Sequence, residues 1–194
     1  MTSENLQIGA RGWRHAHWQD SYYPDDLPEE WQLTFYANDF SVVLVPVEYW
    51  DKQNGYDLES WLDEVEEDFS FYLEAPSFND EAESHLFQSQ CQLMGEQLGG
   101  VLITEMGNVT DLEVPCPVVK NSAAINVKSN AEKLDIGLIT QDYSDLRKIR
   151  TWLESFDKQS VASQKVVFVT NLDTPDVNVN TILEIKTLIE MMGL

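Results

Sequence analysis

Cysteine is scarce in this chain, which has only Cys91 and Cys116 in 194 residues. No CxxC pair or repeated spacing accompanies them, so neither a disulfide framework nor a zinc site is expected, and we predict two unrelated free thiols. Long hydrophobic runs are missing as well. No stretch approaches the ~20 apolar residues that span a bilayer, and the N-terminus lacks the basic and then apolar pattern of a signal peptide. We therefore expect a cytoplasmic protein that does not bind membranes.

Positive charge is the third shortage. The sequence has 12 lysines and arginines against 34 aspartates and glutamates, and no lysine or arginine occurs between Lys52 and Lys120. The formal net charge of -22 repels phosphate backbones and anionic lipids, which argues against nucleic-acid binding. Acids crowd residues 63–68 in particular. Such a run usually faces water, and the alternative is a docking surface for a basic protein partner.

The common catalytic motifs are absent too. The chain has no GxSxG, P-loop, HExxH or GxGxxG pattern, so we expect no cofactor and no bound metal. What the chain does have is a composition that folds: 43% of its residues are hydrophobic, and it contains six tryptophans, seven tyrosines and eight phenylalanines. Its length favours a single domain over residues 1–194.

Apolar runs that suit strands alternate with segments of helical spacing. The expected strands are residues 6–9, 41–50 with an end at Pro46, 69–73, 100–104, 134–140 and 165–171, with one or two short ones around Val118 and Ile125. The expected helices are residues 28–40 with Trp31, Phe35 and either Leu33 or Tyr36 on the buried face, 58–65 after a capping Asp57, 80–98, 144–156 and 178–192. This alternation predicts an α/β fold with parallel strands, either an eight-fold barrel or an open doubly wound sheet. A complete barrel usually takes ~250 residues, so the length argues against one.

Particular residues resemble a known family. The opening IGARGW is followed at matching spacing by Trp18, Tyr23-Pro24, Leu27-Pro28, Trp31, Tyr36-Ala37 and Phe40, and the segment KVVFVTNLDTPDVNVNTIL leads from a strand into the last helix. These residues resemble the YecE-like family, also known as domain of unknown function seventy-two. The resemblance implies a TIM-barrel-like (β/α) repeat fold, shortened or partly open, with about 6–7 mostly parallel strands. The family's length is cut between Met106 and Leu134, so the resemblance implies a reduced middle region over residues 107–133.

The chain departs from this family where a site is expected. Leu44, Val45 and Pro46 stand where the family's second strand carries glutamate, isoleucine and asparagine. The family's third-strand lysine corresponds to Glu74, and its fourth-strand glutamine corresponds to Thr104. Near the expected site, the residues that keep the family pattern are Gly9, Gly12, Trp13 and Asn171. The resemblance therefore implies a fold and a location, but no reaction.

In barrels of this kind, the ligand site lies beyond the C-terminal ends of the strands. The candidate ligand-binding residues there are Arg11, Trp13, Arg14, His15, Glu48, Glu74, Glu105 and Asn171. Arg11 and Arg14 are half of the chain's arginines, which suggests a site for a small carboxylate or phosphate. The alternative is that both arginines pair with the nearby acids Asp20, Asp25 and Asp26.

Two further features of the first loop are open to interpretation. His15 and His17 with Glu48 can form a metal site or a base with its orienting carboxylate, although two histidines in such a loop are more often packing or surface groups. The aromatic residues of the loop can form a stacking platform for sugars or bases, although core packing is their commoner role.

Two functional hypotheses follow. The first is a degenerate barrel that acts as a binding or interaction module, because the second-strand carboxylate is lost and the third-strand charge is reversed. The alternative is a hydrolase-type enzyme for a small anionic substrate at the C-terminal mouth of the strands. In that case Arg11 or Arg14 binds the anion, and Glu48 or Glu74 acts as the base. The sequence carries no signal of oligomeric state.

Overall fold

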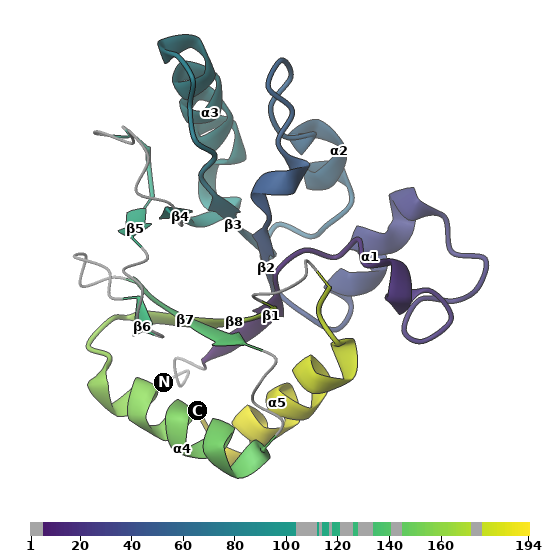
Figure 1. The fold of residues 1–194 in the computed structure, drawn as a ribbon, viewed down its shortest axis with the longest axis vertical. Coiled ribbons are helices and arrows are strands. Elements are labelled where there is room, and N and C mark those ends of the chain that lie inside the picture. Colours follow the sequence, from purple (N-terminus) through teal and green to yellow (C-terminus); the bar gives the residue numbers. More distant parts are fainter. Residues whose placement is uncertain are drawn as a thin grey trace.

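The computed structural model describes residues 6–103, 112, 114–116, 118–120, 126–127, 134–140, 145–171 and 176–194. The strands are β1 (Gln7–Ala10), β2 (Val42–Val45), β3 (Ser70–Glu74), β4 (Leu98–Ile103), β5 (Val118–Lys120), β6 (Asn126–Val127), β7 (Leu134–Thr140) and β8 (Gln164–Thr170). The α-helices are α1 (Gln32–Ala37), α2 (Leu58–Asp63), α3 (Glu81–Met94), α4 (Leu146–Gln159) and α5 (Val179–Met192). The helices lie around the outside of the strands (Figure 1). None of the helices in these ranges is long and apolar enough to cross a membrane.

The strands form two sheets. Their orders are β1-β8-β7-β6 and β2-β3-β4-β5, so each sheet has three longer strands and one short strand at its outer edge. All pairs are parallel except β6 with β7. The expected α/β fold with parallel strands is confirmed. Within the described ranges the ring is not closed, because the sheets place β5 and β6 at separate edges. Most of the expected reduced region, residues 107–133, lies outside the described residues.

The two sheets meet where β1 passes β2. Gly9 permits this approach, because a Cβ atom at that position would collide with the carbonyl oxygen of Val42. The hydroxyl of Tyr36 spans the junction: it accepts a hydrogen bond from the backbone N–H of Ala10 (2.8 Å) and donates one to the Val42 oxygen (2.9 Å). One buried side chain of α1 thus supplies bonds that a regular strand pair would make between backbones.

The space enclosed by the strands is packed with side chains from both sheets. A hydrophobic cluster separate from the main core contains Val42, Leu44, Tyr72, Leu102, Leu134, Ile136, Val166 and Phe168. The rings of Tyr72 and Phe168 lie 5.1 Å apart, and Gln164 donates a hydrogen bond to the Tyr72 hydroxyl (2.7 Å). Because strand side chains alternate between faces, the opposite faces supply the larger cluster that packs under the helices. The strands thus have core on both faces, as expected for parallel strands of an α/β fold.

Candidate functional site

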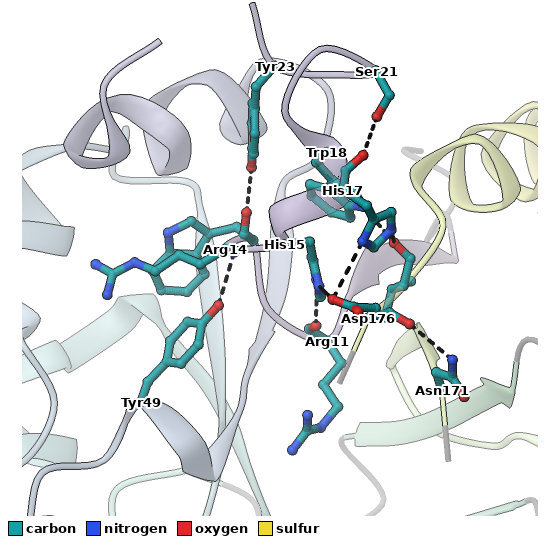
Figure 2. Close-up of polar contacts among 12 residues, drawn as sticks. Arg11, Arg14, His15, His17, Trp18, Ser21, Tyr23, Tyr49, Asn171 and Asp176 are labelled. Carbon is teal, nitrogen blue, oxygen red and sulfur yellow. Dashed lines mark hydrogen bonds and ion pairs between the residues drawn. The ribbon is translucent and has the colours of Figure 1, made fainter. Parts of the chain in front are cut away.

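The first and last strands bring their C-terminal ends together. Just beyond β1, the backbone N–H of Arg11 donates to the oxygen of Val169 in β8 (3.0 Å), and that of Gly12 donates to the oxygen of Leu44 in β2 (2.8 Å). The loops that follow β1 and β8 therefore leave the same edge, and Figure 2 shows their polar residues side by side. The sequence predicted this gathering, because parallel strands direct their C-terminal ends to one side.

Arg11 lies at the centre of this mouth and binds two carboxylates. Its Nε and Nη2 donate to the two oxygens of Glu74 (2.6 and 2.7 Å), and Nη2 also donates to Glu48 (2.6 Å). Glu74 ends β3 and is buried, whereas the side chain of Glu48 is 53% exposed. Glu74 also accepts a hydrogen bond from the backbone N–H of Val47 (3.1 Å). Three strand ends are thus tied together by one guanidinium.

The hydrogen bonds of this ion-pair cluster favour the charged forms of Arg11 and Glu48. Burial lowers the pKa of Arg11, but the hydrogen bonds to Glu74 and Glu48 outweigh burial, so the pKa of Arg11 is raised. Burial raises the pKa of Glu48, and the hydrogen bond from Arg11 reverses this, so its pKa is lowered. The prediction that Arg11 pairs with Asp20, Asp25 or Asp26 is wrong: its partners are acids at the ends of neighbouring strands.

Arg14 points away from Arg11 and lies against aromatic rings. Its guanidinium carbon is 5.6 Å from the ring of Trp13 and 5.4 Å from the ring of Tyr49, and its Nε is 3.9 Å from Glu29. Trp13 is only 1% exposed and packs edge-on against Tyr49 and Trp61. Its burial favours core packing over a stacking platform, because no face of the indole is open to a ligand.

The two histidines meet a carboxylate that the sequence analysis did not single out. Nδ1 of His15 is 3.8 Å, and Nδ1 of His17 3.5 Å, from Oδ1 of Asp176, in the loop between β8 and α5. Asn171, at the end of β8, donates to the backbone oxygen of Asp176 (3.2 Å). The structure thus places Asp176, not Glu48, beside both rings (Figure 2).

The hydrogen bonds of the rings fix their tautomers. Nε2 of His15 lies 3.1 Å from the Arg11 oxygen, and Nε2 of His17 lies 2.9 Å from the Val177 oxygen. A carbonyl oxygen only accepts, so each neutral ring carries its hydrogen on Nε2 and presents Nδ1 to Asp176. Burial, with a smaller effect of His17, lowers the pKa of His15 to about 4, so His15 is neutral at pH 7. Within the described ranges, no three His, Cys, Asp or Glu side chains are grouped to hold a metal ion.

The structure thus joins most of the candidate residues into two groups. Arg11, Glu48 and Glu74 form the first, and His15 and Asn171 belong to the second with Asp176. Thr104 and Glu105 lie outside the described residues. Leu44, where the resembled family has a carboxylate, is buried in the inner hydrophobic cluster. Asp176 gave no signal in the sequence beyond its position in the loop after the last strand.

Comparisons with known proteins concern the family and the fold. A family model described as protein of unknown function DUF72 matches residues 7–104. The crystal structure of a DUF72 family protein from Thermotoga maritima is similar, with a TM-score of 0.67, 12% sequence identity, and coverage of 96% of this chain and 99% of that chain. At this identity the likeness concerns the fold alone. A search of curated proteins gives no match.

Proposed function

Given that this chain belongs to the DUF72 family, whose members are described as proteins of unknown function, we propose that it acts as a binding module for a basic protein partner. The observation that carries this proposal is the state of the barrel mouth. Arg11, the cation that the described residues place at the centre of the mouth, already binds two internal carboxylates, and a small anion would have to displace one of them. The charges of Arg11, Glu48 and Glu74 at the mouth are therefore paired with one another. Recognition of a partner is then assigned to the acidic exterior.

The exterior supports a basic partner. We call residues 63–68 the acidic segment; it begins at the last residue of α2, and its members Asp63, Glu66, Glu67 and Asp68 are exposed. No lysine or arginine occurs from residue 53 to residue 119 to neutralise it. Clustered carboxylates attract a basic surface over about one Debye length, which is ~10 Å at 0.1 M salt. Such attraction speeds association and discriminates against acidic partners.

The test is affinity capture from a lysate of the native host at about 0.05 M and about 0.5 M NaCl. The double variant Glu66→Lys/Glu67→Lys should lose a basic partner that the wild type retains at low salt. The matched control is Asp25→Lys/Asp26→Lys, which changes the net charge equally at exposed acids elsewhere. Equal loss with both variants would mean that total charge, rather than the acidic segment, attracts the partner. Failure to capture any salt-sensitive basic protein would contradict the proposal.

The alternative proposal is a hydrolase for a small anionic substrate. It is favoured by Glu48, which is half exposed and bound to Arg11, because an incoming anion can take its place and release the carboxylate as a base. Phosphoester, ester and glycoside substrates should be screened with the wild type and with Glu48→Gln. Turnover that disappears in Glu48→Gln would establish this alternative over the binding module, and turnover unchanged in Glu48→Gln would exclude Glu48 as the base.

A further inference from the structure

A cavity of about 500 Å³ lies beside the mouth, and nothing in the ion-pair cluster of Arg11 accounts for it. It opens between residues 51–57, the start of α2 and one side of α3. Its lining includes the carboxylates Asp51, Asp57 and Glu59, the rings of Tyr49, Tyr56 and Trp61, and the side chains of Arg14, Gln90 and Leu93. A volume of this size falls within the range of about 300 to 1,000 Å³ that is typical of ligand sites.

One residue of the lining has an unmet hydrogen-bonding requirement. Trp61 is 1% exposed, and its buried indole N–H has no acceptor among the described residues. The other large aromatic groups nearby are satisfied: the hydroxyl of Tyr56 donates to the oxygen of Glu74 (2.7 Å), and that of Tyr49 accepts from the N–H of Arg14 (3.0 Å). A buried donor without a partner is costly, so a ligand that brings an acceptor to Trp61 recovers that cost.

The charges of the lining indicate a cationic ligand. The lining contains three carboxylates and one arginine. The side chain of Asp57 accepts no N–H of α2, so it is not used as a helix cap. The oxygen of Asp51 accepts the N–H groups of Gln53 (2.9 Å) and Asn54 (2.7 Å). These backbone bonds lower the pKa of Asp51 and keep it ionised. The cavity therefore holds an excess of negative charge.

One ring of the lining, that of Tyr49, already contacts a guanidinium, and the second ring that this guanidinium contacts, Trp13, lies outside the lining. Arg14 lies over the rings of Trp13 and Tyr49 at 5.6 and 5.4 Å, within the range of a cation–π contact. At the rim, Leu93 of α3 is 59% exposed, which offers an apolar contact to a residue beside the cation. Carboxylates, aromatic rings, an apolar rim and an unpaired donor together match a basic side chain, its apolar neighbour and a main-chain carbonyl.

We propose that this cavity binds an arginine or lysine side chain of an extended peptide segment, whose main-chain carbonyl accepts the Trp61 indole N–H. The inference rests on the proposed function, since it names the place where a basic partner would insert a side chain. Asp57 and Glu59 would pair with the cation, and Leu93 would contact the residue next to it.

The test uses the acetylated and amidated tripeptide Leu-Arg-Leu, with Leu-Glu-Leu as the matched control peptide. In ¹H–¹⁵N spectra of the full chain, Leu-Arg-Leu should shift the Trp61 indole signal saturably, and Leu-Glu-Leu should leave it in place. Asp57→Asn should weaken the affinity by about tenfold, the effect of losing one close charge pair. Asp25→Asn, which removes an exposed carboxylate outside the cavity, should change it by less than about twofold.

The outcomes separate this inference from the proposed function. Equal weakening by Asp57→Asn and Asp25→Asn, or a Trp61 signal that stays fixed during saturation, would overturn the cavity as the site. If the partner captured by the wild type is lost with Glu66→Lys/Glu67→Lys but retained by Asp57→Asn, the binding module stands and the cavity proposal fails. Loss with both variants, together with the Trp61 shift, supports both.

Discussion

Arg11 shows how far a single residue can be understood from the sequence. Its place after the first strand identified it as a mouth residue, and Glu48 and Glu74 were predicted to lie at the same mouth. Their pairing was not predicted, because the sequence analysis matched Arg11 with acids nearby in the chain. The true partners are 37 and 63 residues away, and only the side-by-side order of β1, β2 and β3 brings them together.

Removing one carboxylate of this cluster should show which bond matters. We expect Glu74→Gln to lower the free energy of unfolding by about 2 to 4 kcal/mol, because it leaves a largely buried guanidinium with one exposed partner. Glu48→Gln removes an exposed partner and should cost only about 0 to 1 kcal/mol. Urea unfolding of both variants at pH 7 measures this, through the midpoint at constant slope. Similar losses would show that burial of Glu74 contributes nothing to the pair.

His15 gives the fold a dependence on pH. Its pKa is lowered by burial from 6.5 to about 4 in the folded chain. Between these values the unfolded chain binds more protons, so stability falls as pH decreases from about 6.5 to about 4, by on the order of 2 to 3 kcal/mol. His15→Gln should lose this part of the pH dependence while other carboxylates titrate unchanged. The measurement is the difference in urea midpoint between wild type and variant across this range, and a constant difference would contradict it.

At the scale of elements, sequence patterns located nearly every strand and helix but placed several ends wrongly. The helix predicted over residues 80–98 is α3, which ends at Met94 before Gly95, whose φ is 55°. The helix predicted from residue 28 begins as a 3₁₀ turn, Glu29–Trp31, and this change of period turns Trp31 outward to 61% exposure. Asp57 is at the N-cap position of α2, but its side chain accepts no N–H of the helix. Period and composition predict elements, whereas backbone hydrogen bonds at the ends decide their limits.

The link between the sheets can be tested through α1. Tyr36→Phe removes the hydroxyl shared by Ala10 and Val42, and leaves a buried N–H without an acceptor. We expect a loss of about 1 to 3 kcal/mol in the free energy of unfolding. Tyr49→Phe is the control, because its hydroxyl accepts one N–H at an exposed position where water can replace it. The comparison fails if the two substitutions cost the same in urea unfolding.

At the scale of the whole molecule, the resemblance indicated the fold and the composition indicated the net charge. Neither predicted whether the ring of strands closes. The residues that match the resembled family lie in the first and last parts of the chain, which form β1 to β4 and β8. The inner cluster, shared by both sheets, could not be predicted from one strand's pattern: β2, for example, is apolar and buried along its whole length. Burial on two sides hides which side faces inward.

Salt should stabilise the whole molecule. With a net charge of -22, the folded chain repels itself, and screening reduces this repulsion. Raising NaCl from about 0.05 M to about 0.5 M should raise Tm, by about 2 to 4 °C for each kcal/mol gained. Calorimetry at pH 7 measures this. A Tm that falls with NaCl would mean that ion pairs such as Arg11–Glu74 outweigh the general repulsion.

The contact between Gly9 and Val42 limits what mutation can do at that position. No side chain fits there, so in a library of all single substitutions position 9 should be depleted as strongly as the most buried core positions. Depletion at Gly9 would then record how closely two strands approach. Intolerance of substitution at a residue beside the mouth is therefore no sign that it takes part in chemistry.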